Sequence, residues 1–202
     1  MSENDRTYNL IITGVGGQGN VLASQLVGQA FVSKGWFATI GETYGASQRG
    51  GPVMSHIRIS EKKQRSPLIP QGKADIIMAL EPVEALRVMA PYGNADVTVI
   101  VNTRSIFPVE VTAGDENYPE MEEIQSVLNR LSKKAYFINA VEMAIQMGLP
   151  ILSNMIMMGA LLSLNLLPLS VEEFADVLSK NLAHKHLEIN MKALAEGAQA
   201  IA

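Results

Sequence analysis

The sequence predicts an α/β fold in which a mostly parallel sheet carries helices on both faces. Three observations predict it: strand-type and helix-type segments alternate as far as about residue 140, the first strand ends at a glycine-rich turn, and no strand-type segment follows residue 138. Together they indicate a doubly wound, Rossmann-like sheet over residues 8–140, with an edge hairpin, and a C-terminal helical extension over residues 141–202. At 202 residues the chain is expected to form one domain, residues 1–202.

The first three strands are expected before residue 60. Residues 8–13 are apolar and rich in β-formers, and residues 20–34 carry apolar side chains at helical spacing. Residues 36–40 then form a second strand, and this β-α-β order predicts parallel pairing with the first strand. Residues 53–60 alternate between apolar and polar, which predicts an exposed or edge strand.

The remaining elements follow from similar signals. We expect strands at 74–80, 96–101 and 135–138, and helices at 82–90, 118–132, 154–164, 170–180 and 187–202. Ser170 and Glu173 have the spacing of a helix capping box.

The apolar stretch from Ile151 to Leu169 is nearly long enough to cross a membrane. Pro150 and Pro168 bracket it and four polar residues interrupt it, so we expect a buried helix and no membrane span. Its methionines could form an adaptable interaction surface, but core packing is the preferred interpretation.

Composition excludes several classes of function. A net charge of -4 gives no support for nucleic-acid binding. The chain has no cysteine, which excludes disulfides, thiolate nucleophiles and iron–sulfur clusters held by its own thiolates. Residues 1–7 lack the features of a secretory signal, so the expected location is cytoplasmic.

The glycine-rich turn is the first candidate site. Gly14, Gly16 and Gly19 have the G-x-G-x-x-G spacing between a strand and a helix, where backbone N–H groups can approach a pyrophosphate at the helix N-terminus. The predicted anion-binding residues are Gly14, Gly16, Gly17, Gln18 and Gly19. The alternative is close strand–helix packing without a ligand.

Two further features could contribute to this site. Glu42 lies about where an acidic residue binds the ribose of NAD in dinucleotide-binding folds, although a surface glutamate is an equal interpretation. Arg49 could clamp a phosphate or carboxylate within a flexible segment whose candidate residues are Ser47, Arg49, Gly50 and Gly51. The alternative for Arg49 is a weak surface ion pair.

No catalytic or metal site is predicted. His184 and His186 are two residues apart and would not share a helix face, and His56 stands alone in a strand. The sequence contains no zinc-protease motif, no nucleophile elbow and no phosphate-binding Walker motif. These observations indicate a binding domain without its own catalytic machinery.

Two segments together resemble one family. Ile-Ile-Thr-Gly-Val-Gly-Gly-Gln-Gly at 11–19 and Ser-Gln-Arg-Gly-Gly-Pro-Val-Met-Ser-His-Ile-Arg-Ile at 47–59 resemble the gamma-type domain of 2-oxoacid:ferredoxin oxidoreductases. The second segment is most similar to the small (beta) subunit of indolepyruvate ferredoxin oxidoreductases. Pyruvate-specific chains usually carry a Pro-Glu-Met-Arg-Gly-Gly type of sequence there, so the difference favours aryl pyruvates.

The resemblance implies a role in oxidative decarboxylation of a 2-oxoacid to an acyl-CoA, with electrons passed to ferredoxin. It implies that thiamine diphosphate and iron–sulfur clusters belong to a catalytic partner chain, and that the glycine turn and Arg49 contact coenzyme A. The expected assembly is a hetero-oligomer, with a homodimer as an alternative for the isolated chain. Two other functions stay open, an NAD(P)-dependent dehydrogenase and a purely structural interaction protein, as do the 2-oxoacid and the oligomeric state.

Overall fold

The computed structural model describes residues 6–45, 51–106 and 117–201 of the chain. Its strands lie within a few residues of the segments that the apolar runs predict. They are β1 (Thr7–Val15), β2 (Phe37–Tyr44), β3 (Pro52–Ser60), β4 (Ile76–Ala79), β5 (Thr98–Asn102) and β6 (Lys134–Ile138).

The helices begin at residues suited to that position. Pro82 opens one helix, and the preceding Glu81 side chain accepts a hydrogen bond from Glu84 N at 3.0 Å. The predicted capping box of Ser170 and Glu173 is confirmed. The helices are α1 (Asn20–Ser33), α2 (Pro82–Tyr92), α4 (Met121–Leu131), α5 (Ala140–Gln146), α6 (Ser153–Ser163), α7 (Val171–Asn181) and α8 (His184–Gln199), with a 3₁₀ turn η1 (Pro150–Leu152).

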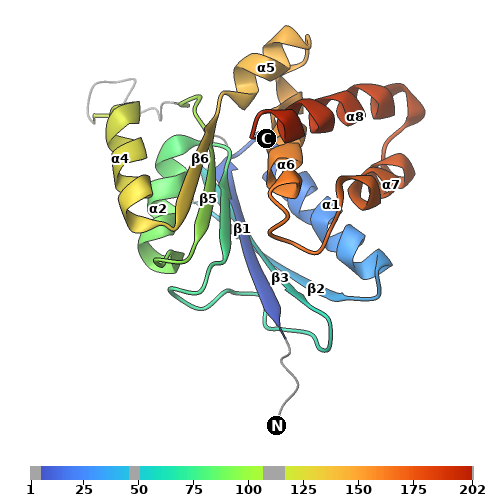
Figure 1. Ribbon diagram of the computed structural model, residues 1–202, viewed down its shortest axis with the longest axis horizontal. Helices are drawn as coiled ribbons and strands as arrows, with labels where there is room; N and C mark the ends of the chain where they lie inside the picture. The colour runs from blue at the N-terminus through green and yellow to red at the C-terminus, as the bar shows by residue number, and fades with distance from the viewer. Residues whose placement is uncertain (1–5, 46–50, 107–116, 202) are drawn as a thin grey trace.

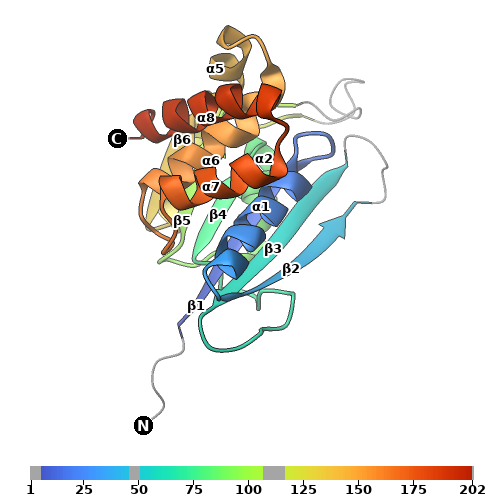
Figure 2. The ribbon, with the colours of Figure 1, turned by 90° about the vertical axis from the view of Figure 1, so that its right-hand side faces the viewer.

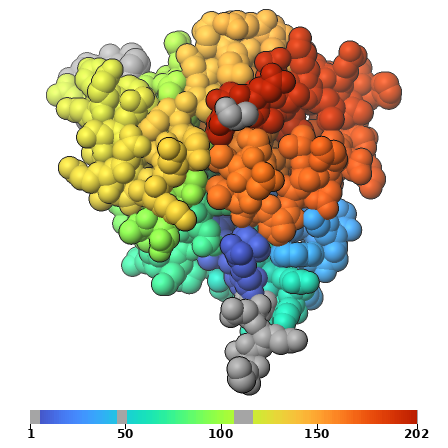
Figure 3. All heavy atoms as spheres, viewed as in Figure 1, coloured from blue at the N-terminus to red at the C-terminus, as the bar shows by residue number. Residues whose placement is uncertain are grey.

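These elements form three layers, with the sheet between two layers of helices (Figure 1). α1 and the C-terminal helices α6, α7 and α8 cover one face, while α2 and α4 cover the other. In the space-filling view the C-terminal helices and α1 form one continuous surface (Figure 3). The predicted doubly wound α/β fold with a C-terminal helical extension is therefore confirmed.

The order of the strands corrects one prediction. The sheet runs β2-β3-β1-β4-β5-β6, so β1 does not pair with β2. β3 lies between them and is antiparallel to both, whereas β1, β4, β5 and β6 are mutually parallel. The expected parallel pairing of the first two strands is wrong, because the hairpin return after β2 inserts β3 beside β1.

The same insertion changes the position of the alternating strand. β3 is internal, and β2 is the outer strand of the predicted edge hairpin. Ile57 and Ile59 of β3 join the core beneath α1, while Met54 packs on the opposite face. Alternation along β3 therefore reflects two differently covered faces of a buried strand, not one solvated face.

The apolar C-terminal segment forms the center of the core beneath α8. Met155, Met157 and Met158 of α6 are each 1% exposed or less, which confirms core packing of the methionines. In the described part of the chain, no helix is both long and apolar enough to cross a membrane. α6 and α8 approach very closely, because Gly159 lies against the backbone of Leu194 and Gly197 against the backbone of Ile156.

His56 of β3 is fully buried and gives the fold a pH dependence. Its Nδ1 accepts a hydrogen bond from Ile69 N at 3.4 Å, and its ring meets the Tyr92 ring edge-on at 5.0 Å between centroids. Burial lowers the pKa of His56 below the ordinary histidine value. Below about pH 6.5 the unfolded chain therefore binds a proton that the folded chain does not.

We expect the free energy of unfolding to fall as the pH decreases below about 6.5, and this His56 contribution to reach at most about 1.4 kcal/mol per pH unit. His56→Leu should remove that contribution to the slope, measured by urea unfolding between pH 7 and pH 5. His186→Leu, an exposed replacement on α8, is the matched control and should keep it. An unchanged slope in His56→Leu would contradict the assignment.

Candidate functional site

The glycine turn joins β1 to α1 through backbone conformations that suit glycine. Gly17 and Gly19 have φ angles of 100° and 86°, in the left-handed region. Gly16 N donates to Gly51 O at 3.0 Å, which ties the turn to the start of β3. The predicted G-x-G-x-x-G turn is therefore present as a strand–turn–helix unit, and its ligand stays a prediction.

Gln18 holds the turn in place from inside the chain. Its Oε1 accepts from Val15 N at 2.8 Å, and its Nε2 donates to Leu80 O at 2.8 Å. A Cβ at Gly14 would lie 2.5 Å from the Gln18 Oε1, so glycine at position 14 makes room for this side chain. Both polar ends of Gln18 are thus already bonded within the fold.

Leu80 O is a junction for the loops at this edge of the sheet. It accepts from Gln18 Nε2 and from Asn102 Nδ2, the second at 3.0 Å. Asn102 Oδ1 in turn accepts from Val141 N at 3.3 Å. The turn after β1 is therefore coupled to the segments that follow β4, β5 and β6, which meet at the carboxyl ends of parallel strands.

A second polar cluster lies next to this junction. The Glu81 carboxylate, 2% exposed, accepts from Tyr118 Oη and from Ile106 N. Glu84 is bonded to Arg87 at 2.7 Å, and burial raises the pKa of the Glu84 carboxyl. These groups satisfy one another and hold the segments around α2 together.

The N-terminus of α1 faces the candidate site without an acidic neighbour. Gly19 occupies the N-cap position, no side chain caps the helix, and its first turn holds no acidic residue. Among the described residues, no hydrogen-bond partner takes the N–H groups of Asn20, Val21 or Leu22. Free N–H groups at the positive end of a helix favour an anion.

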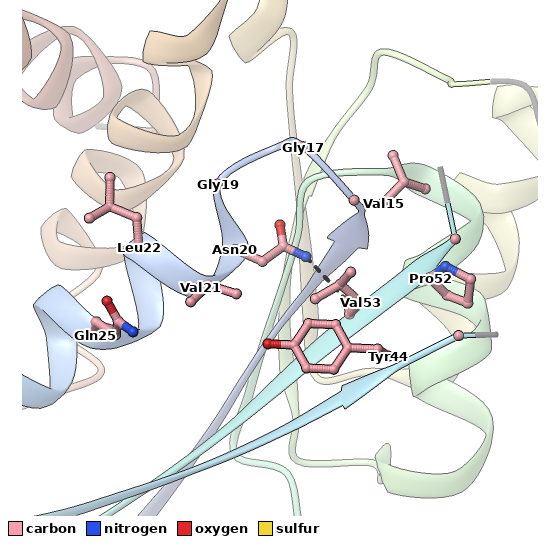
Figure 4. A pocket seen from close by; sticks show the side chains of 13 residues that line it. Val15, Gly17, Gly19, Asn20, Val21, Leu22, Gln25, Tyr44, Pro52 and Val53 are labelled. Carbon is pink, nitrogen blue, oxygen red and sulfur yellow. Dashed lines mark hydrogen bonds between the residues drawn. The ribbon is translucent and has the colours of Figure 1, made fainter. Parts of the chain in front are cut away.

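Asn20 is buried beneath the turn. Its Nδ2 donates to Val53 O at 3.1 Å, as Figure 4 shows, and its Oδ1 has no partner in the described part of the chain. The side chain is 3% exposed, and its oxygen lies on the side of Gly14. Asn20 therefore fixes the start of α1 against β3.

A cavity of about 900 Å³ opens beside the turn. The turn and the first half of α1 form one wall, and the adjoining ends of β2 and β3 form the other, with Tyr44 between them (Figure 4). The lining residues that decide its chemistry are Gly17, Gly19, Asn20, Val21, Gln25 and Tyr44. This volume is within the range of small-molecule and cofactor sites.

The second predicted segment is only partly described. Ser47, Arg49 and Gly50 lie outside the described residues, so their predicted ligand contacts stay predictions. Gly51 is described, is buried, and lines the cavity, as does Gly45 at the other end of the segment. The two ends of the segment thus meet at the cavity.

Glu42 lies farther from the turn than the dinucleotide-binding pattern implies. It is on β2, and because β3 is inserted, two strand spacings of about 4.8 Å separate β2 from β1. The Glu42 carboxylate accepts a hydrogen bond from Tyr44 Oη. The geometry therefore gives no added support to a ribose contact at Glu42.

No metal center is evident in residues 6–45, 51–106 and 117–201, where no group of three or more histidine, aspartate or glutamate side chains could hold an ion. The cavity residues Asn20, Gln25 and Tyr44 did not emerge as ligand-binding candidates from the sequence. Tyr44 lies three residues before the motif at 47–59, and nothing in the spacing indicated that its ring borders a cavity.

Comparisons with known proteins agree with this architecture. A family model described as pyruvate ferredoxin/flavodoxin oxidoreductase matches residues 9–200. Indolepyruvate oxidoreductase subunit IorB of Archaeoglobus fulgidus is 38% identical over 189 residues, 94% of this chain and 92% of the relative. The same-named subunit of Pyrococcus horikoshii is 37% identical over 196 residues, 96% of each chain.

Solved structures match the fold. The pyruvate oxidoreductase subunit PORC of Thermotoga maritima superposes with a TM-score of 0.70 and 18% identity, covering 96% of this chain and 97% of that one. A 2-oxoglutarate:ferredoxin oxidoreductase from Magnetococcus marinus, solved with 2-oxoglutarate, coenzyme A and succinyl-CoA, gives 0.74 at 20% identity. It covers 98% of this chain and 31% of the larger one.

Proposed function

The chain belongs to the pyruvate ferredoxin/flavodoxin oxidoreductase family, and on that premise we propose that it is the non-catalytic subunit of an indolepyruvate-type 2-oxoacid:ferredoxin oxidoreductase. The complex would decarboxylate an aryl pyruvate oxidatively, form the acyl-CoA and pass the electrons to ferredoxin. Full-length similarity to two IorB subunits supports this assignment above the pyruvate-specific one.

The division of labour follows from what this chain contains. It has no cysteine, so the iron–sulfur clusters would be held by a catalytic partner chain together with thiamine diphosphate. Thiamine diphosphate supplies carbanion stabilisation when bound. This chain would bind and orient the second substrate at the candidate site, and it is expected to be inactive alone.

One observation carries the assignment of that second substrate. The free N–H groups at the start of α1 open into a cavity of about 900 Å³ without an acidic side chain in the first helical turn. A pyrophosphate fits this arrangement, since the N–H groups can donate to its oxygens. We assign the cavity to coenzyme A, with the pyrophosphate at the glycine turn, and keep Arg49 and its neighbours as proposed contacts.

An NAD(P)-dependent dehydrogenase is the competing function for a glycine turn of this kind. The position of Glu42 and the lack of a catalytic set weigh against it. Isothermal titration of the assembled complex with coenzyme A and with NADH separates the two. Binding of NADH without binding of coenzyme A would overturn the proposal.

Val21→Glu tests the anion site directly. Val21 lies in the first turn of α1 and lines the cavity, so the added carboxylate would repel a bound pyrophosphate. A carboxylate at this end of a helix stabilises the helix by about 0.3–1 kcal/mol, so weaker binding would not result from unfolding. We expect the KM for coenzyme A to rise at least tenfold, measured by indolepyruvate-dependent reduction of ferredoxin in the assembled complex.

Val21→Gln is the matched control, because it adds nearly the same volume without the charge. It should keep the KM for coenzyme A within about threefold of the unmodified complex, in line with an effect that depends on charge. Equal increases in both variants would indicate a steric effect, and no increase in Val21→Glu would place coenzyme A elsewhere.

A further inference from the structure

The exposed side of α1 carries no charge. Residues 20–33 contain no Asp, Glu, Lys or Arg, and the exposed positions along one side are Leu22, Gln25, Gln29 and Val32. Their spacing of three, four and three residues places them in a single row. Leu22 and Val32 are 44% and 59% exposed, and the exposed side of a surface helix usually carries charged side chains instead.

The edge strand β2 runs beside this row. Figure 2 shows β2 at the free edge of the sheet, with β3 between β2 and the α1 ribbon in this view, and α1 contacts both strands. Within the described residues no strand pairs with the outer side of β2, and its single charged residue, Glu42, is bonded to Tyr44 Oη. Exposed edge strands are normally protected by lysine, proline or a bulge, and β2 has no lysine or proline.

The row has a pattern that complements itself. Read in either direction it runs apolar, glutamine, glutamine, apolar. When two copies of α1 lie antiparallel across a two-fold axis, Leu22 faces Val32 of the partner copy, and Gln25 faces Gln29 of the partner copy. A glutamine amide both donates and accepts hydrogen bonds, so the two central pairs are complementary as well.

A single two-fold axis is compatible with both the packing of the two α1 helices and the pairing of the two β2 strands. A Cβ at Gly28, near the middle of the row, would lie 2.9 Å from Ile40 Cδ1, near the middle of β2. α1 packs on β2 and β3 and to a smaller extent on β1, so strands paired across the axis at about 4.8 Å would place the two α1 helices about 10–12 Å apart. The lower end of this range matches the spacing of packed helices, about 8–10 Å.

We propose that a second copy of this chain docks on the face formed by Leu22, Gln25, Gln29, Val32, Phe37 and Ile40, with the α1 helices antiparallel across a two-fold axis. Lys34, which follows α1, does not interfere, because its Nζ is bonded to Glu173 of α7 at 2.6 Å. Leu22 and Gln25 also border the large cavity, so the partner copy would close its open side. The proposal does not depend on the identity of the ligand.

Sedimentation equilibrium of the full chain tests the dimer. Gln25→Glu with Gln29→Glu places like charges opposite each other in both central pairs, and we expect the dissociation constant of the dimer to rise at least 100-fold. Gln25→Lys with Gln29→Glu places Lys opposite Glu in both pairs and should restore dimerisation at low salt. Both positions changed, 25 and 29, carry exposed glutamines, and circular dichroism checks that each variant is folded.

Three other outcomes would overturn the proposal. The unmodified chain could be monomeric at 100 µM, the two double variants could both dimerise, or the two double variants could both fail to dimerise. The unmodified chain could be monomeric while the Gln25→Glu, Gln29→Glu variant no longer binds the catalytic chain. That result would assign the face to the catalytic chain instead. Gln25 also lines the coenzyme A cavity, so the coenzyme A titration is made on the assembled complex with Gln25 and Gln29 unchanged, and the two proposals fail separately.

Cross-linking tests the register of the helices. The chain has no cysteine, so a single engineered thiol reacts without background. A short bismaleimide should join a Gln25→Cys chain to a Gln29→Cys chain at least fivefold more efficiently than it joins two Gln25→Cys chains. Glu188→Cys, exposed on α8, is the control and should not be joined. Equal yields in all mixtures would overturn the antiparallel arrangement.

Discussion

Gly197→Ala is expected to destabilise the fold by about 3 kcal/mol or more, at the upper end of the costs of overpacking a core. The added methyl group would overlap the carbonyl oxygen of Ile156 on α6, and the reciprocal overlap would arise at Gly159 with the carbonyl oxygen of Leu194. Backbone cannot move aside like the end of a side chain, so α6 and α8 would have to separate. Urea unfolding of the full chain measures the loss.

The sign of this effect identifies its cause. Helix propensity alone predicts that Gly→Ala inside a helix stabilises by about 1 kcal/mol. Ala195→Gly on the exposed side of α8 is the matched control and should cost only that propensity term. A stabilised Gly197→Ala variant would show that α6 and α8 do not cross at these glycines.

The sequence predicts the elements well where local signals define them. The apolar run of β1, the capping box of α7 and the proline that opens α2 are each contained in a short window, and all three are confirmed. The pairing partner of β1 is not contained in such a window. Alternation along residues 53–60 suits an edge strand or an internal strand between two different layers, and only the tertiary structure distinguishes them.

The candidate site likewise has a part that the sequence predicts and a part that only the tertiary structure shows. The spacing of Gly14, Gly16 and Gly19 predicts the turn, and at Gly19 the positive φ makes the preference for glycine a local property of the backbone. Gly14 instead makes room for the Gln18 side chain. The role of Gln18 depends on Leu80 O, which is 62 residues away and has no side-chain signature. Similarly, Tyr44 borders the cavity only because the β2–β3 hairpin brings it opposite α1.

Gly19→Ala is expected to combine a loss of stability with weaker coenzyme A binding. At a φ of 86° a side chain costs about 1–2 kcal/mol of backbone strain. The new Cβ would also overlap the Nδ2 of Asn154, which is only 3% exposed and therefore has little room to move. We expect a total cost of about 3 kcal/mol, of the kind seen when strain and overpacking combine, and a KM for coenzyme A at least tenfold higher.

Gly17→Ala separates the two causes. Its φ of 100° imposes similar strain, but no atom lies within 4 Å of the added Cβ, so this variant should lose only about 1–2 kcal/mol. Asn154→Ala in the Gly19→Ala background should recover about 1 kcal/mol or more relative to additivity, because it removes the overlapping amide. Equal losses in Gly17→Ala and Gly19→Ala, with no coupling to Asn154, would mean that backbone conformation alone requires glycine at position 19. The contact between α1 and α6 would then have no part in shaping the anion site.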